Sequence, residues 1–263
     1  MGLQVRPLRR DFVRPLVRAM KQSPAVTASY TQNRVDNAVT GYINRTTELT
    51  GMADSATWTV SGWVRFDGAT TTTGRIFNCF EAGGVGGFTV RRITASNNVV
   101  FAFTDSTGGV STGSRTLAAG VADGSWHHFL IAVNSTGAGS IYSWWDGTAV
   151  DSNVAFVSAG FNFDWHTVPM VNHGICGTAA GANVIDGAVA DIWLGNAFIN
   201  DITKFYSAGA ISLGADGSTP GVSPLIYMGG SMLAAQWNAA PVVNLGTGGN
   251  FTKAGAASFT DTT

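Results

Sequence analysis

The sequence predicts an all-β fold, a sandwich of two antiparallel sheets that carries an extended N-terminal arm. Only 12% of the 263 residues are charged and 34 are Gly, a composition typical of short strands joined by many turns. Residues 57–66 alternate apolar and polar side chains with period two, which indicates a half-buried strand. Residues 123–150 contain two strand-like runs, and Asp146-Gly147 ends the second. This dipeptide favours a two-residue hairpin turn, because both turn positions need positive φ.

The composition divides the chain into three regions. A basic and apolar arm with its linker spans residues 1–50, and the sandwich spans residues 51–209. Residues 210–263 are rich in Gly, Ala and Thr and are expected to pack on the sandwich instead of forming a second core.

The arm has a charge that the rest of the chain does not share. Six basic residues against Asp11 give residues 1–21 a charge of +5, so a net charge of −1 leaves −6 on the remainder. Arginines alternate with apolar side chains here, which favours docking into a groove of a partner protein over binding a nucleic acid. The residues expected to make this contact are Arg6, Arg9, Arg10, Phe12, Arg14, Leu16 and Arg18.

Further strand-like segments follow one another with Thr-, Gly- and Asn-rich turns between them. They cover residues 75–80, 87–93, 98–103, 114–117, 127–133, 141–145 and 185–193. Residues 200–207 are expected to form a single helical turn, with Asn200 as its N-cap.

The order of these segments resembles that of laminin G-like domains of the concanavalin A-like jelly-roll superfamily. The resemblance rests on Trp-Thr-Val-Ser-Gly-Trp-Val from residue 58, Asp-Gly-Ser-Trp-His-His from residue 123 and Ile-Asp-Gly-Ala-Val-Ala-Asp-Ile-Trp from residue 185. It implies a jelly-roll sandwich, a fold that hosts sugar binders, protein binders, glycosidases and structural modules. Related domains often bind calcium at the rim formed by their loops. Calcium therefore remains a candidate cofactor, with Asp105 and Asp186 as its candidate ligands. No other cofactor is expected.

The sequence contains few residues in arrangements that suggest catalysis. Glycosidases need a pair of carboxylates across a cleft, whereas the chain has only two Glu, Glu48 and Glu81, and its Asp residues mostly flank Gly or Ser as in turns. His127 and His128 are adjacent on a strand and therefore face opposite sides of the sheet. One packed and one half-exposed histidine are expected, with no metal site, so the sequence predicts a protein that is not an enzyme.

The cysteines and the tryptophans have mostly structural interpretations. Cys79 and Cys176 are expected to be free and buried, with a disulfide as the alternative. Most aromatic residues are expected in the core, including Trp58, Trp126, Trp144 and Trp193. The candidates for stacking on a carbohydrate are Trp63, Trp145 and Trp165, although cover by the C-terminal segment is an equal alternative.

Taken together, these features resemble phage virion proteins that carry lectin-like domains as capsid decoration or tail accessory parts. The resemblance implies a structural virion protein that other virion proteins hold through its arm, as a homo-oligomer on the particle. A host surface glycan is a further candidate partner. No export signal or membrane span is evident. The alternatives are a carbohydrate-binding module of a secreted or surface protein and, second, a glycan-active enzyme.

Overall fold

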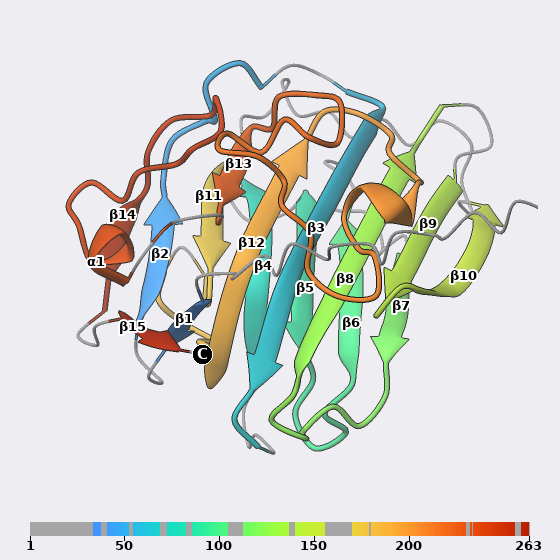
Figure 1. The fold of residues 1–263 in the computed structure, drawn as a ribbon, viewed down its shortest axis with the longest axis horizontal. Coiled ribbons are helices and arrows are strands. Elements are labelled where there is room, and N and C mark those ends of the chain that lie inside the picture. Colours follow the sequence, from blue (N-terminus) through green and yellow to red (C-terminus); the bar gives the residue numbers. More distant parts are fainter. Residues whose placement is uncertain are drawn as a thin grey trace, which may run out of the picture.

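The structure is a computed structural model that describes the greater part of the chain. The described residues are 34–37, 41–52, 55–68, 73–82, 86–104, 113–136, 140–155, 170–178, 180–229, 232, 234–255 and 259–262. They form two antiparallel sheets packed face to face, with one short helix, α1 (Ala234–Trp237), and one 3-10 turn, η1 (Ile202–Lys204) (Figure 1). The predicted all-β sandwich is confirmed.

Sheet A lies in front in Figure 1 and has eight strands within the described part of the chain. In spatial order it contains β10 (Thr148–Ala155), β9 (Ser140–Trp145), β8 (Trp126–Asn134), β3 (Thr57–Phe66), β12 (Gly187–Gly195), β1 (Arg34–Asn37) and β15 (Phe259–Thr262). Its eighth strand, β13 (Ile226–Met228), pairs with the C-terminal half of β12.

Sheet B lies behind sheet A and has seven strands among the described residues. In spatial order it contains β14 (Thr252–Ala254), β2 (Tyr42–Arg45), β11 (Met170–Ile175), β4 (Gly74–Glu81), β5 (Gly87–Arg92), β6 (Val99–Thr104) and β7 (Gly113–Ala118). Strands β1 and β2 fall within residues 1–50, which the sequence predicts as an arm and a linker that becomes the first strand near residues 38–43. That expected strand overlaps β2, whereas β1 has only four residues and is too short for alternation to reveal it.

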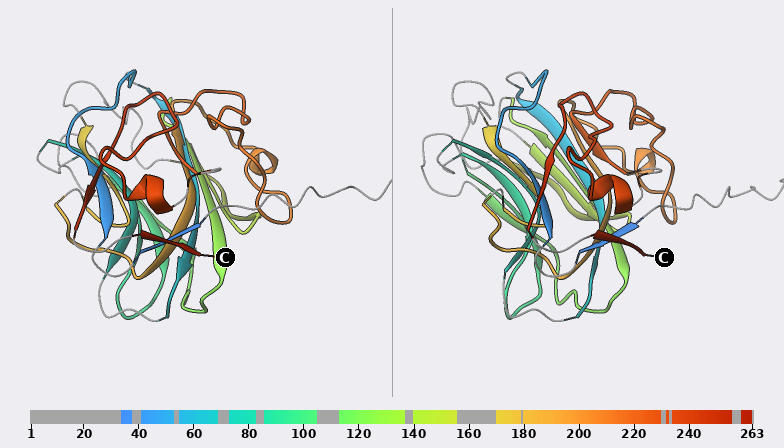
Figure 2. Two further views of the ribbon diagram at one scale, coloured as in Figure 1. Left: turned by 60° about the vertical axis from the view of Figure 1, so that its left-hand side comes forward. Right: turned by 90° about the vertical axis from the view of Figure 1, so that its left-hand side faces the viewer.

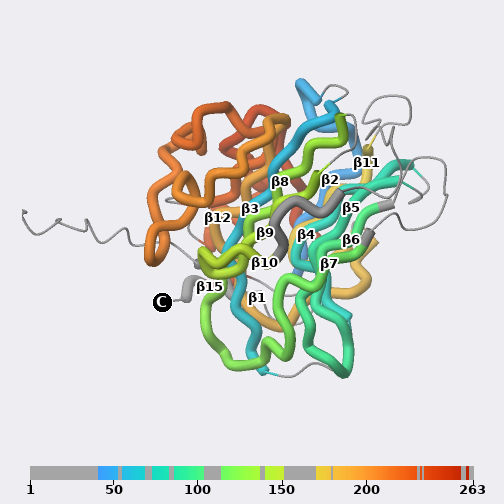
Figure 3. The backbone as a smooth tube through the Cα atoms, turned by 90° about the vertical axis from the view of Figure 1, so that its right-hand side faces the viewer, coloured from blue at the N-terminus to red at the C-terminus, as the bar shows by residue number. Residues whose placement is uncertain are grey.

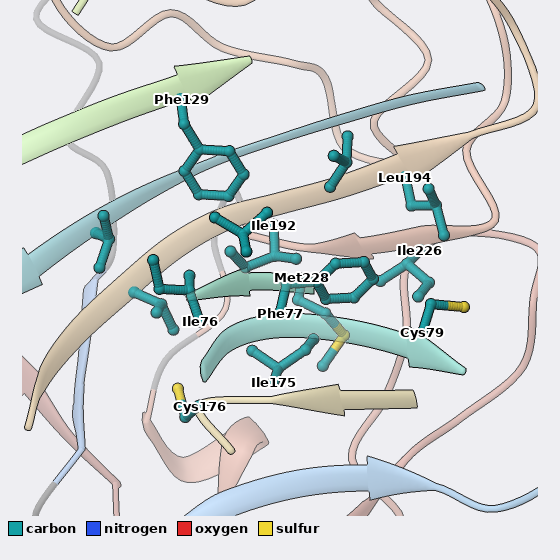
Figure 4. Close-up of a cluster of buried hydrophobic side chains, with 14 of the residues drawn as sticks. Ile76, Phe77, Cys79, Phe129, Ile175, Cys176, Ile192, Leu194, Ile226 and Met228 are labelled. Atoms are coloured by element: carbon teal, nitrogen blue, oxygen red, sulfur yellow. The ribbon is translucent and has the colours of Figure 1, made fainter. Parts of the chain in front are cut away.

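The core lies between the two sheets, and β3 shows how the sequence pattern builds it. Trp58, Val60, Val64 and Phe66 are all buried in the main hydrophobic cluster, as their alternation predicts. Gly62 lies on the same face, where a Cβ atom would come within 2.6 Å of the Ile192 side chain. The missing side chain therefore leaves room for the side chains of Ile192 and Phe129, from the neighbouring strands, to pack over β3. Figure 4 shows Ile192 and Phe129 in this cluster, facing Phe77 and Ile175 of sheet B.

The predicted hairpin is present at Asp146-Gly147. Trp145 pairs with Thr148 across a two-residue turn, and the turn residues have φ of 49° and 75°. Both angles lie in the left-handed region that this turn requires.

A third layer covers the outer face of sheet A. Residues 196–227 pass over it and bury Leu130 and Trp193 against Phe205 and Tyr227. Figures 2 and 3 show this orange segment on the side of sheet A that faces away from sheet B. Hydrogen bonds fasten it: the Trp193 indole donates to the carbonyl of Gly217 at 2.8 Å, and the hydroxyl of Thr59 donates to that of Ala197.

Two details of this layer differ from the sequence expectations. The N-cap of η1 is Asp201, whose carboxylate accepts the backbone N–H of Thr203, and not Asn200. Of the four tryptophans expected in the core, Trp58 and Trp193 are fully buried, whereas Trp126 and Trp144 are only partly buried. The latter two point outward from sheet A, where the third layer covers them incompletely.

Candidate binding surface

The outer face of sheet B is the candidate binding surface, because among the described residues it carries rows of polar side chains and no apolar layer like the one on sheet A. The strand registers place one continuous row of small residues across all seven strands. From edge to edge the row is Thr252, Asn44, Gly174, Asn78, Thr89, Ala102 and Ser114. The buried clusters of described residues belong to the core and to the third layer on sheet A. Rows of small polar side chains leave a sheet face that a ligand can approach closely.

A second row on this face is basic. Arg75 of β4 lies opposite Arg91 of β5, and both are partly exposed. A bulge at Ile76 sets this arrangement, since the pairing shifts between Arg75 and Phe77. Both Ile76 and Phe77 are buried in the core, which leaves Arg75 facing outward with Asn78.

Arg75 is held in place by an aromatic ring. Its guanidinium carbon lies 5.1 Å from the centroid of the Phe80 ring, which is partly buried on the same face. This distance is within the range of a cation–π contact. Because Asn78 lies between Arg75 and Phe80 along β4, the arginine side chain extends across it.

Asn78 is a buried polar residue on this outer face, with 1% of its surface exposed. Its Nδ2 donates to the carbonyl of Asn172 at 3.2 Å, and the Asn172 amide donates to the carbonyl of Glu81 at 2.7 Å. The Oδ1 atom of Asn78 has no hydrogen-bond partner among the described residues. An unsatisfied acceptor beneath a polar surface is a position where a ligand hydroxyl can donate.

The electrostatic environment of the two arginines is repulsive. Burial, and then the charge of Arg91, lower the pKa of the Arg75 guanidinium from its usual value. The outward residues of the two rows described above include no Asp or Glu. The Nε atoms of Arg75 and Arg91 are also without hydrogen-bond partners in the described part of the chain.

The three tryptophans predicted to contact a carbohydrate are not brought together. Trp63 was expected either to contact a ligand or to be covered by the C-terminal segment, and it is covered, since only 8% of its surface is exposed. It lies on the outer face of sheet A, where Tyr206 stacks on it with ring centroids 5.7 Å apart. The cover comes from a segment more than 140 residues away in sequence, so the alternation of β3 alone could not reveal it.

Trp145 lies on the other face of sheet A. It pairs with Phe129, points toward the space between the sheets and packs partly against the main core. Its ring stacks on His127 at 5.0 Å. Trp165 lies outside the described residues, as do the predicted contact residues of the arm, Arg6, Arg9, Arg10, Phe12, Arg14, Leu16 and Arg18.

The two adjacent histidines have opposite environments, as predicted. His128 is buried between Trp63 and Tyr206, and its Nε2 lies 2.9 Å from the hydroxyl of Ser61. Burial lowers the pKa of His128 to about 3. Tyr206 of the third layer packs against His128, so this Ser–His pair lies beneath a packed layer and is a packing contact.

His127 is partly exposed and lies between two carboxylates. Its Nδ1 is 2.7 Å from Asp146, and its Nε2 is 3.1 Å from Asp123. The hydrogen bond to Asp146, foremost, raises the pKa of His127. Asp146 also accepts the backbone N–H of His128 at 2.7 Å, so this cluster ties the hairpin turn to β8.

A buried contact between a cysteine and a histidine was missed by the sequence analysis. The Sγ of Cys79 lies 2.9 Å from Nδ1 of His173, inside the core. Burial raises the pKa of the Cys79 thiol and lowers that of His173 to about 3, so both are neutral. The two residues are 94 positions apart and no local pattern links them. Cys79 and Cys176 are both free and buried, which confirms that expectation.

The calcium expectation has no structural test. Asp105 lies outside the described residues, and Asp186 is exposed. Within the described ranges, no three His, Cys, Asp or Glu residues gather as metal ligands would.

Comparison with known families agrees with the fold. The family model described as the concanavalin A-like lectin/glucanases superfamily matches residues 37–198. No curated protein sequence matches the chain. A putative carbohydrate-binding protein from Bacteroides ovatus has a similar structure, with a TM-score of 0.53 and 11% identity, over 88% of this chain and 60% of that one.

Two other similar structures come from animals. The mouse laminin α1 chain, domains LG4-5, matches with a TM-score of 0.47 and 13% identity, over 64% of this chain and 43% of that one. The heptameric SAP-like pentraxin of Limulus polyphemus matches with a TM-score of 0.49 and 11% identity, over 68% of this chain and 84% of that one. This chain therefore spans under two thirds of the laminin and Bacteroides chains. None of the helices in the described residues is long and apolar enough to cross a membrane.

Proposed function

Because the chain belongs to the concanavalin A-like lectin/glucanase superfamily, we propose that it is a non-enzymatic module that binds carbohydrate on the outer face of sheet B. The observation that carries this proposal is the difference between the two outer faces of the sandwich. The chain covers sheet A with its own residues 196–227, whereas sheet B presents polar rows. Flat rows of amide and hydroxyl groups suit the many hydroxyl groups of a sugar.

The proposal of a non-enzymatic role has its own support. The Ser61–His128 and Cys79–His173 pairs are buried, and burial leaves both histidines and the thiol neutral. Hydrolysis of a glycoside would need two carboxylates facing one cleft, and the rows described on sheet B offer none.

Glycan-array binding of the purified chain tests the proposed surface. Phe80→Ala removes the ring under Arg75 and is expected to weaken binding by about tenfold, because the guanidinium loses its support. Trp126→Ala is a matched control, since this aromatic is also partly buried but lies on sheet A. Binding that is lost in the control and kept in Phe80→Ala would contradict the proposal, provided that both variants keep the parental circular dichroism spectrum.

The second part of the proposal concerns where this module is found, on a phage particle. We propose that the chain is a capsid decoration or tail accessory protein, carried in several copies and held by other virion proteins through its arm. The support is the arm composition, six basic residues and one acid interleaved with apolar side chains. Mass spectrometry of purified particles tests it. Absence of the chain from particles that form in its presence would contradict it.

A further inference from the structure

Three polar side-chain atoms at nearby positions in the middle of the sheet B face have no hydrogen-bond partner among the described residues. They are the Nε donors of Arg75 and Arg91 and the Oδ1 acceptor of Asn78. Arg75 and Arg91 are cross-strand partners, and Asn78 lies three residues along β4 on the same outward side. Buried donors and acceptors are normally paired in folded proteins, because an unpaired buried group is costly. Unpaired atoms also occur at His128 and His173, away from this face, so the indication of a ligand comes from these three atoms together with the two facing arginines. Such a ligand would supply both an acceptor and a donor.

The charges indicate what kind of acceptor it is. Two like charges face each other across neighbouring strands, and a directly opposed pair of this kind destabilises a sheet. Among the described residues, Arg91 is the ionised neighbour that lowers the pKa of Arg75, after burial. An anionic group between the guanidinium groups would relieve the repulsion, and charge-assisted hydrogen bonds to carboxylate or sulfate are about twice as strong as neutral ones. The contact with Phe80 restrains Arg75, so less conformational freedom is lost on binding.

We infer that the sheet B face binds an acidic carbohydrate, with its carboxylate or sulfate between Arg75 and Arg91 and a neighbouring hydroxyl donating to Asn78. This inference rests on the proposed function and specifies its ligand class. Two arginines are too few for strong attraction to a nucleic acid backbone, since that attraction grows with the number of phosphates neutralised. The adjoining row of amide and hydroxyl groups is suited to a sugar ring.

Matched pairs of probes isolate the charge. Oligogalacturonate carries a carboxylate on each sugar, and its methyl ester has the same backbone without the charge. Dextran sulfate and dextran provide the same comparison for sulfate. In isothermal titration at low salt, we expect one acidic probe to bind at least about tenfold more tightly than its neutral partner. Added salt should weaken that binding, because the exposed part of the contact is screened.

Variants assign the effect to these residues. Arg75→Gln and Arg91→Gln should each weaken binding of the acidic probe by about tenfold, and Asn78→Ala should weaken binding of both members of a pair. Arg65→Gln is the matched control, since Arg65 lies on the opposite sheet with Asp67 as its ion-pair partner. It should leave binding unchanged. Because Asn78 is buried and its variant can unfold, thermal melting is measured for each protein. The variants of the two arginines, which are only partly buried, keep the test decisive.

The outcomes separate this inference from the proposed function. Equal binding of acidic and neutral probes, sensitive to Phe80→Ala, would overturn the inference and leave the proposed function standing. An acidic preference unchanged in both arginine variants, or displaced equally well by duplex DNA, would also overturn the inference. Absence of binding to every probe and every array glycan would overturn both.

Discussion

At the residue scale, the two neighbouring histidines show how position decides charge. His127 and His128 differ by one place in the sequence, yet the first gains two carboxylate partners and the second is enclosed by Trp63 and Tyr206. The period of a strand predicts that they face opposite sides, and this was confirmed. The residues that contact each histidine could not be predicted, because Asp146 and Tyr206 come from later parts of the chain.

These environments predict how stability depends on pH. Burial lowers the pKa of His128 and of His173 to about 3, against an unfolded value near 6.5. The unfolded chain therefore takes up more protons below pH 6.5, so stability is fully present above that pH and falls as the pH decreases. Each histidine should remove about 2 kcal/mol between pH 7.5 and pH 5. His127 opposes this, because its raised pKa gives stability that is present at low pH and lost as the pH rises through its folded pKa.

Urea unfolding at pH 7.5 and pH 5 measures this dependence. His173→Gln should reduce the loss of unfolding free energy at pH 5, whereas His127→Gln should increase it. The lowered pKa values of Asp123, Asp201 and Asp216 affect stability only at more acidic pH, as these groups start near 3.8. Equal unfolding free energies at the two pH values, in the parent protein, would contradict the burial of both histidines.

At the element scale, the hairpin between β9 and β10 was predictable to the residue, because its turn depends on local backbone chemistry. The alternation of β3 likewise gave the correct inner face. For Trp63, on the outer face, ligand contact and cover stayed equal expectations, because alternation distinguishes two sides without showing which side is covered. The arginine pair on sheet B was missed for a related reason, since the bulge at Ile76 shifts the facing of β4 by one residue.

Replacing a glycine in a turn should lower the unfolding free energy for two separate reasons, backbone strain and a steric clash. Gly147 has φ of 75°, and a Cβ atom there would lie 2.6 Å from the ring of Tyr206. Gly124 has φ of 72°, but nothing lies within 4 Å of its Cβ position. Gly124→Ala should therefore lower the unfolding free energy by about 1 kcal/mol through backbone strain alone, and Gly147→Ala by about 1 to 3 kcal/mol more through overpacking.

A double-mutant cycle separates the two effects. Combining Gly147→Ala with Tyr206→Ala removes the clash, so the double variant should lose less stability than the two single losses added together. Thermal or chemical unfolding of the four proteins measures the coupling. Additive losses would show that the third layer does not press on this turn.

At the scale of the whole molecule, the two outer faces of the sandwich differ: among the described residues, sheet A is covered by a third layer and sheet B carries rows of polar side chains. The apolar residues of segment 196–227 have no regular spacing, because an irregular segment places its side chains where the covered sheet needs them and has no helical or strand period. The sequence therefore predicts the two sheets but not the layer that closes one of them. Among the described residues that layer covers sheet A, and it leaves the polar rows of sheet B as the face proposed for binding.

The arm provides the last prediction, which concerns attachment to a larger particle. Residues 1–22 contain six basic residues and one acid, together with Leu8, Phe12, Val13, Leu16, Val17 and Met20. So few apolar residues cannot build a core of their own, but they suit a partner that offers acidic and apolar surface. We expect full-length protein to co-sediment with phage particles that lack it, and protein spanning residues 23–263 to stay in the supernatant while keeping the parental circular dichroism spectrum. Salt should weaken the attachment without unfolding the sandwich, because exposed arginine contacts are screened. Equal co-sedimentation of the truncated chain would show that the sandwich, and not the arm, holds the protein on the particle.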